Sequence, residues 1–139
     1  MKVEGKVLKP TGKEKYWSVE IPILAIHTQG KSEKDAYRMA AHAVGMLAEL
    51  SNFKVICEPI GHGEFLISAS DEDAFLAFVF RRLRMARNVT LAEAATHLGS
   101  KSKNAYGRYE QGKTSPTVKK LDQLIRSIDP SCVLVLKRT

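Results

Sequence analysis

The sequence of 139 residues has only two cysteines, Cys57 and Cys132, and they lack the paired spacing of a zinc site. We expect both to be ordinary thiols that stay reduced in the cytoplasm. Long apolar runs are also missing, both for a membrane-spanning helix and for a secretion signal. The sequence therefore predicts a cytoplasmic protein that has no membrane partner.

Patterns that bind metals or cofactors are scarce as well. The four histidines are scattered, without an i,i+4 pair and without a neighbouring cysteine pair, so we expect no metal site. The sequence has no phosphate-cradling glycine loop and no nucleophile elbow, so we expect no cofactor. The histidines are His27, His42, His62 and His97.

Acidic residues on expected strands are the remaining candidates for catalysis. A ribonuclease-H-type active site gathers several carboxylates around two metal ions. Glutamate is common on exposed strand faces, and Asp35, the one aspartate before Asp71, is placed to cap a helix. We therefore expect the protein not to be an enzyme. The strand acids are Glu4, Glu20, Glu58 and Glu64.

The net charge of +7 is divided unevenly along the chain. Residues 1–78 carry 9 Lys and Arg against 11 Asp and Glu, whereas residues 79–139 carry 13 against 4. A basic excess confined to one half favours binding to a polyanion, most simply DNA. The hydrophobic content of 44% supports a packed core, and the first half is expected to have a different role.

Residues 1–69 are predicted to form a first domain with the order β-β-α-β-β. Alternating apolar residues predict strands over residues 1–9 and 17–26, and Pro22 marks an edge or a bulge in the second strand. Thr28-Gln-Gly-Lys31 is expected to break that strand. Ser32 then caps a helix, with Asp35 three residues later at the capping-box position.

The helix after Ser32 carries an apolar stripe suited to packing on a sheet. Two further short strands, residues 53–58 and 64–68, are joined through residues 59–63, where His62 is expected to be a turn residue. These patterns predict a small β-sheet with one helix on one face. The stripe consists of Ala36, Ala40, Ala43, Leu47 and Leu50.

Residues 70–139 are predicted to form an all-α second domain with a terminal strand, which makes the whole chain α+β. A helix is expected to start at Ser70 and to run to Asn88. A short helix over residues 91–98 follows, and Thr90 is placed to cap it while Gly99 can end it with a positive φ.

A second short helix is expected after Ser102, whose hydroxyl is placed to cap it. Gly112 ends this helix, and Ser115-Pro116 begins a last helix with proline in its first turn. The apolar residues 131–137 then predict a strand. Such a strand needs a partner, either from a second copy or from elsewhere in its own chain.

Residues 79–128 resemble the helix-turn-helix DNA-binding domains of Cro and the phage repressors. The resemblance implies that Lys103, Asn104 and Arg108 face base edges in the major groove, where Arg pairs with guanine and Asn with adenine. Helix N-termini and lysines suit phosphate contacts. The residues expected at phosphates are Thr90, Lys101, Ser102 and Lys113.

Four residues of the same region are expected to be structural. The resemblance implies that Arg84 and Glu110 form a partly buried ion pair across the domain. Tyr106 and Tyr109 are expected to pack in the core rather than to stack on bases. Losing one partner of a buried pair leaves a desolvated charge, so the pair would stabilise the domain.

The two halves together resemble the HicB-type antitoxins of their helix-turn-helix subgroup. The first half carries a strand pair ending in Thr28-Gln29-Gly30 and then an Ala-rich helix, and residues 98–112 carry the more specific match. The resemblance implies an inactive, truncated ribonuclease-H-like sheet that binds a HicA-type ribonuclease toxin. It also implies that the second domain represses its own operon by binding operator DNA as a homodimer or higher oligomer.

Two other functions remain compatible with the sequence. One is a transcriptional repressor whose first domain senses a small molecule. The other is a nuclease with a DNA-targeting domain, which would require metal-dependent cleavage that disappears on mutation of Glu4 or Glu20. The identity of the molecule that the first domain binds distinguishes these possibilities.

Overall fold

The computed structural model describes residues 1–49 and 53–139, and the chain divides into two compact units, Met1–Glu72 and Asp73–Thr139. Each unit is described by itself. The first is built on an antiparallel sheet and the second on helices, so the architecture is α+β. No helix within the described residues is both long and apolar enough to cross a membrane.

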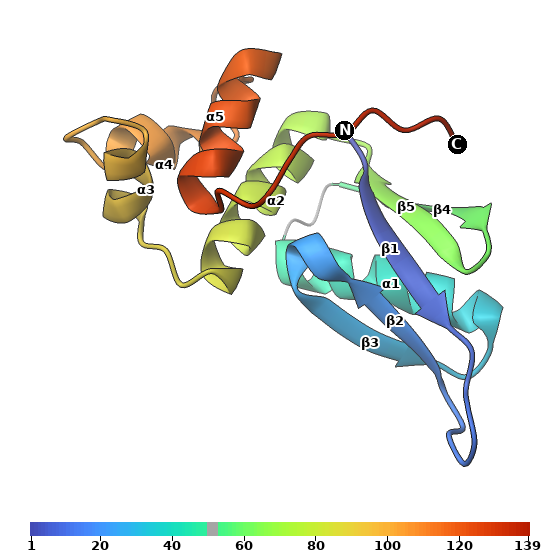
Figure 1. Ribbon diagram of the computed structural model, residues 1–139. Helices are drawn as coiled ribbons and strands as arrows, with labels where there is room; N and C mark the ends of the chain where they lie inside the picture. Colours follow the sequence, from blue (N-terminus) through green and yellow to red (C-terminus); the bar gives the residue numbers. More distant parts are fainter. Residues whose placement is uncertain (50–52) are drawn as a thin grey trace. The chain divides into compact units, whose positions relative to one another are not determined.

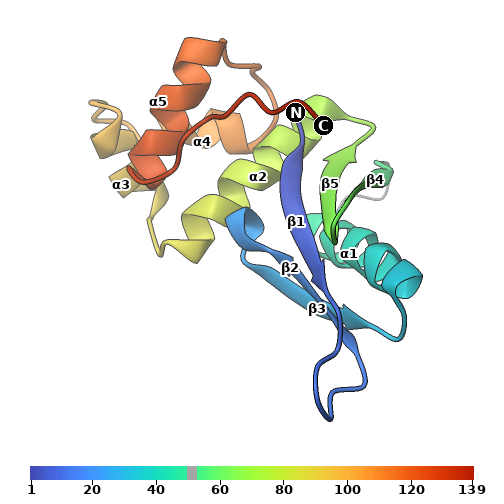
Figure 2. The same ribbon diagram turned by 45° about the vertical axis from the view of Figure 1, so that its right-hand side comes forward.

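The first unit is a five-stranded antiparallel sheet with one helix, α1, across one face (Figure 1). The strand order is β3-β2-β1-β5-β4, so the first strand lies in the middle of the sheet. The turned view shows α1 on the same side of the strands (Figure 2). The elements are β1 (Val3–Leu8), β2 (Trp17–Ile21), β3 (Ile26–Gly30), α1 (Glu33–Ala48), β4 (Val55–Gly61) and β5 (Glu64–Ala69).

The expected second strand is in fact two strands, and the prediction was wrong at this point. β2 ends at Ile21, a single 3-10 turn (Pro22–Leu24) follows, and Ala25 takes a positive φ of 50° before β3 begins. Ile21 therefore pairs with Ile26 across a hairpin. Proline fixes its φ and has no N–H to donate, which favours a turn over a continuous strand.

Thr28-Gln29-Gly30, which was expected to form a loop, lies inside β3. Gly30 is required there because a Cβ at this position would lie only 2.4 Å from the backbone nitrogen of Ala36 in α1. A second glycine, Gly5 in β1, has the Phe65 ring of β5 where a Cβ would be, with the nearest ring carbon at 2.2 Å. These two close approaches let the helix and the aromatic ring pack directly on the strands.

Helix α1 begins as predicted, with Ser32 Oγ accepting the amide of Asp35 at 3.1 Å. The Asp35 carboxylate accepts the amide of Lys31 at 2.9 Å, and this bond and the nearby Arg38 lower the pKa of Asp35. The predicted stripe was wrong toward the end of the helix, because Val44 is buried while Leu47 is exposed. The buried side follows a four-residue step, Ala36, Ala40, Val44 and Ala48, and the predicted Leu50 lies outside the described residues.

Strands β4 and β5 form the other hairpin close to the predicted positions. β4 runs on to Gly61, so Pro59 belongs to the strand rather than to the turn, and the register shifts between Pro59 and Gly61. His62 is a turn residue with φ 53°. Since β4 is an edge strand, the missing N–H of Pro59 is tolerated.

The second unit contains four helices and no described strand. They are α2 (Glu72–Ala86), which starts at the unit boundary, α3 (Leu91–His97), α4 (Asn104–Glu110) and α5 (Val118–Ile128). α2 ends two residues before the predicted Asn88, because Asn88 takes φ 53° and the Val89 amide bonds back to the Arg84 carbonyl at 3.1 Å. This is a Schellman-type ending with asparagine in the usual place of glycine.

The last helix and the C-terminal segment both differ from the prediction. α5 is capped by Thr117, whose hydroxyl accepts the amide of Lys120 at 3.2 Å, so Pro116 precedes the helix instead of lying in its first turn. The described residues 131–139 are neither strand nor helix. A strand needs a neighbour to complete its hydrogen bonds, and the second unit supplies no other strand among its described residues.

Candidate nucleic-acid interface

Helix α3 is bounded by two features that the sequence predicts. Thr90 Oγ1 accepts the amide of Glu93 at 3.1 Å, which caps the first turn. At the other end Gly99 has φ 81°, and the Ser100 amide bonds to the Ala95 carbonyl at 2.9 Å. These bonds form a Schellman motif, so the chain leaves α3 in a defined direction toward α4.

The start of α4 differs slightly from the expected cap. The helix begins at Asn104, directly after Lys103, and Ser102 lies one residue further back. Its hydroxyl still accepts the Asn104 amide at 3.3 Å, and its carbonyl accepts the Ala105 amide at 3.0 Å. Ser102 therefore accepts hydrogen bonds from amides that have no partner within the short helix, although Lys103 and not Ser102 directly precedes that helix.

The two faces of α4 have opposite character. Tyr106 and Tyr109 are buried, and the Tyr106 ring packs against Phe80 of α2 with the ring centroids 6.4 Å apart. The predicted DNA-reading residues Lys103, Asn104 and Arg108 are all exposed. The tyrosines hold the helix in place while its polar face stays open to a ligand.

Arg108 is positioned by its neighbour before any ligand binds. Its guanidinium carbon lies 5.1 Å from the centre of the Tyr109 ring, and Nη2 donates to the Tyr109 hydroxyl at 3.3 Å. A guanidinium held over an aromatic face has fewer rotamers to lose when it pairs with a planar acceptor. This arrangement suits bidentate pairing to a guanine edge.

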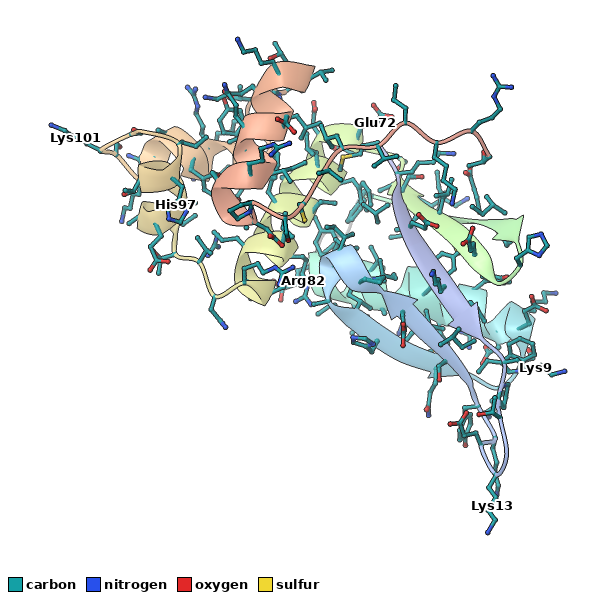
Figure 3. All side chains as sticks on the ribbon, viewed as in Figure 1. Lys9, Lys13, Glu72, Arg82, His97 and Lys101 are labelled. Atoms are coloured by element: carbon teal, nitrogen blue, oxygen red, sulfur yellow. The ribbon has the colours of Figure 1, made fainter. Side chains whose placement is uncertain are left out.

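The residues expected at phosphates surround this helix in the chain. Thr90 is exposed, and its hydroxyl hydrogen remains available because the oxygen acts as an acceptor in the cap. Lys101 and Ser102 lie in the exposed turn between α3 and α4, where the Lys101 side chain projects outward (Figure 3). Lys113 is exposed just after Gly112, which has φ 69° and ends α4.

Arg84 and Glu110 form the ion pair implied by the resemblance. Arg84 Nε lies 2.6 Å from Glu110 Oε1, and both side chains are mostly buried. The hydrogen bond to Glu110 raises the pKa of Arg84. Burial, together with the nearby negative charge of Glu110, raises the pKa of Tyr106 well above its usual range. Arg84 is therefore charged, and Tyr106 neutral, at neutral pH.

Two structural links in this unit carried no clear sequence signal. His97 Nδ1 lies 2.7 Å from the Ser127 carbonyl oxygen and so ties α3 to α5. Asp129, buried at the end of α5, binds Arg87 at 2.5 Å between Oδ2 and Nη2. These residues are far apart in the sequence, and only folding brings them together.

The described residues contain no group of three or more His, Cys, Asp or Glu side chains that could hold a metal ion. The two cysteines are half-buried, and burial raises the pKa of Cys57 to about 11. Its thiol is therefore protonated at neutral pH.

The second unit is strongly basic. Residues 73–139 contain 13 Lys and Arg but only five Asp and Glu.

Comparison with known proteins agrees with this geometry in the second unit. Residues 80–129 match the family model described as helix-turn-helix, and the domain there is of the Cro/C1 type. The chain thus contains a helix-turn-helix domain, which indicates sequence-specific binding of double-stranded DNA and a role in transcription regulation. No curated protein matches the chain.

Proposed function

We propose that the protein is a HicB-type antitoxin. Its first unit, a ribonuclease-H-like sheet without activity, binds and neutralises a HicA-type ribonuclease toxin. Its second unit binds the operator of its own operon. The observation that carries this proposal is an acidic sheet face in the same chain as a basic helix-turn-helix domain, because an RNA-binding toxin and DNA require surfaces of opposite charge.

The acidic face is the side of the sheet opposite α1. In β1 the buried residues Val3, Gly5 and Val7 alternate with exposed ones, and the latter point away from the helix side. The register then identifies the other members of this face, because directly opposed residues in antiparallel strands share a side. Its four acids are Glu4, Glu20, Glu58 and Glu64.

Lysines on this face offset only part of that charge. Lys6 lies opposite Glu20 on one side and opposite Glu64 on the other, and Lys2 Nζ contacts the Glu58 carboxylate. Four acids thus face two lysines. Exposed Leu8, 47% accessible, adds an apolar contact site beside the charges. A negative face with apolar spots is complementary to the basic substrate-binding face of a small ribonuclease, and covering that face blocks RNA access.

The second unit supplies the regulatory half of the proposal. Two copies related by a two-fold axis would place their α4 helices in major-groove half-sites about 34 Å apart. Lysines at phosphates add affinity without sequence preference, while Asn104 and Arg108 supply discrimination of about 1–3 kcal/mol for each good base pair contact. Joining several such domains through bound toxin would raise the effective concentration at the operator, so toxin level would tune repression.

The test is growth and messenger-RNA stability in cells that express the small neighbouring open reading frame with and without this chain. We expect toxicity and mRNA loss that co-expression of the chain reverses. A harmless neighbour, or toxicity that the chain leaves unchanged, would contradict the proposal. It would favour a repressor whose first unit binds a small molecule.

Two triple variants test whether the acidic face is the surface that neutralises the toxin. Removing charge from the acidic face with Glu4→Gln, Glu20→Gln and Glu64→Gln should abolish neutralisation and leave operator binding within about twofold, since those acids lie in the other unit. The matched control removes three exposed glutamates elsewhere in the first unit, namely Glu14→Gln, Glu33→Gln and Glu49→Gln. Equal loss in both triple variants would contradict a role for this particular face.

A further inference from the structure

The turn between β1 and β2 extends basic side chains away from the rest of the first unit. Figures 1 and 2 both show residues 9–16 reaching beyond the sheet, at the end where β3 leads into α1. Lys13 projects from the tip of the turn and Lys9 from its base (Figure 3). These two lysines and Lys15 are exposed, and none of the three forms an ion pair with a described residue. Their charge is therefore available to a partner of opposite sign.

The turn has a defined shape of its own. The Glu14 amide donates to the Thr11 carbonyl at 3.1 Å, and the Glu14 carboxylate accepts the Thr11 amide at 3.2 Å. Between them Gly12 takes φ 59°, a conformation that residues with a Cβ rarely adopt. Because the backbone is already hydrogen-bonded, a partner that binds here has little ordering cost to offset.

The start of α1 adds further positive charge at the same place. Trp17 of β2 pairs with Gly30 of β3, and α1 starts shortly after this strand. Lys31 and Lys34, both exposed, therefore lie at the same end of the sheet as the turn. We call residues 9–17 and 31–38 together the basic end.

The charge of the first unit is strongly divided between this end and the remainder. The basic end contains six basic and three acidic residues. The rest of residues 1–72 contains three basic and seven acidic residues. The excess of positive charge is thus confined to one end of a unit whose open sheet face is acidic.

Two aromatic residues accompany the lysines. Tyr16 is 43% accessible, and Trp17, the first residue of β2, is partly exposed. Among the described residues neither ring packs against another aromatic ring, whereas Tyr37 of α1 packs edge-on against Phe65 with the centroids 5.8 Å apart. Proteins bind single-stranded nucleic acids with this combination, because lysines attract the phosphates while exposed rings stack on the bases.

We propose that the basic end binds single-stranded RNA, with its lysines at phosphates and with Tyr16 and Trp17 stacked on bases. A single strand leaves the faces of its bases free for both rings, whereas the bases of a duplex are stacked on one another and expose only their edges. The choice of RNA over single-stranded DNA rests on the proposed function, since RNA is the substrate of the toxin. One unit would then bind toxin and RNA on different surfaces.

The chain has a single tryptophan, and it lies in the proposed site. Titration of the full chain with octauridylate, followed by Trp17 fluorescence, therefore reports binding at the basic end, while the second unit contributes no tryptophan signal. We expect saturable quenching that weakens as the salt concentration rises. The measurement needs no toxin, so its failure is distinct from failure of the antitoxin proposal.

Three results of this titration would overturn the inference. The first is the absence of saturable quenching by octauridylate. The second is equal quenching by an octaglutamate peptide, which would indicate an acidic protein segment as the partner. The third is tighter binding of octathymidylate than of octauridylate, which would contradict the choice of RNA.

A triple variant without the turn lysines tests the phosphate contacts. It should weaken octauridylate binding by at least about tenfold and lower the slope of log affinity against log salt by about two, because fewer counterions are released. The matched control removes the same charge from the three other lysines of the first unit and should keep affinity within about twofold. Equal weakening in both would overturn the inference. The substitutions are Lys9→Gln, Lys13→Gln and Lys15→Gln in the test and Lys2→Gln, Lys6→Gln and Lys54→Gln in the control.

A single variant tests the stacking contact. Tyr16→Ala should weaken octauridylate binding by about tenfold, as expected for the loss of one stacked base. Tyr16→Phe keeps the ring and is the matched control, so it should bind as the unaltered chain does. Circular dichroism should be the same for all three proteins, since Tyr16 is exposed. Unchanged affinity in Tyr16→Ala would overturn the assignment of this ring to a base.

Discussion

The Arg84 guanidinium donates hydrogen bonds from two of its nitrogens to the Glu110 carboxylate and from the third to the Val89 carbonyl. Nε donates to Oε1 at 2.6 Å, Nη2 donates to Oε2 at 3.0 Å, and Nη1 donates to the Val89 oxygen at 2.9 Å. One guanidinium thus joins the end of α2, the turn before α3 and the end of α4. This connection fixes the base of the helix whose outer face is proposed to read DNA.

Removing one partner of this pair should destabilise the second unit. Glu110→Gln and Arg84→Met should each lower the free energy of unfolding by about 3 kcal/mol, since each leaves a mostly buried charge without its partner. Denaturant unfolding checks this, and the double variant should lose less than the sum of the two. The exposed pair Arg126–Asp122 is the control, with an expected loss below about 0.5 kcal/mol. Additive losses in the double variant would show that the pair is not coupled.

Replacing Arg108 should separate affinity from sequence preference. Arg108→Lys keeps the positive charge but loses the planar fork, so operator affinity should fall about tenfold or more while affinity for unrelated DNA changes little. Lys113→Arg, which keeps the charge at an expected phosphate contact, is the control and should preserve both affinities. Binding measured on operator and scrambled DNA over several salt concentrations checks this. A uniform loss on both DNAs would place Arg108 at a phosphate instead.

Two glycines near the interface should respond oppositely to alanine. Gly99 has φ 81° and Gly107 lies within α4, and at neither would a Cβ meet a described atom within 4 Å. Gly99→Ala should therefore lower the free energy of unfolding by about 1 kcal/mol through backbone strain alone. Gly107→Ala should raise it by about 0.5–1 kcal/mol, because alanine favours a helix.

Thermal unfolding of the two glycine variants checks the signs. Gly99→Asn serves as the control, since asparagine tolerates the left-handed region better than alanine and should lose less stability. Operator binding of Gly107→Ala adds a second readout. If Gly107→Ala raises the free energy of unfolding as expected but abolishes operator binding, the result would show that DNA approaches the α4 backbone at this position.

The Asp129 carboxylate should make the second unit sensitive to acid. Hydrogen bonds from Ser131 and the charge of Arg87 lower the pKa of Asp129 in the folded protein. A carboxyl with a lowered folded pKa contributes stability above its unfolded pKa of about 3.9, and this contribution is lost as the pH falls through the folded pKa.

Asp129→Asn should therefore cost about 2 kcal/mol near neutral pH, the value of hydrogen bonds to a charged group, and progressively less below about pH 4. Unfolding of both proteins between pH 7 and pH 3 checks this. The control is Asp122→Asn, whose exposed carboxylate should give a small difference at every pH. A stability difference for Asp129→Asn that stays constant with pH would exclude the ionised carboxylate as the cause.

Local chemistry explains which predictions from the sequence were accurate. The caps at Ser32 and Thr90 and the positive φ of Gly99 depend on residues within a few positions of one another, and all three are present in the structure. The sheet was less predictable. Pro22 marked an irregularity, but the sequence alone did not show that the chain would reverse there and form a third strand.

The sequence by itself determined the cap and the end of α3, the charge division of the chain and the polar face of α4, because these follow from neighbouring residues and composition. Only the tertiary structure decided what each glycine and each buried charge contacts. Gly30 is needed because α1 crosses it, and Asp129 finds Arg87 from 42 positions away. Such contacts depend on how elements pack, and packing is set by the whole chain rather than by any one segment of it.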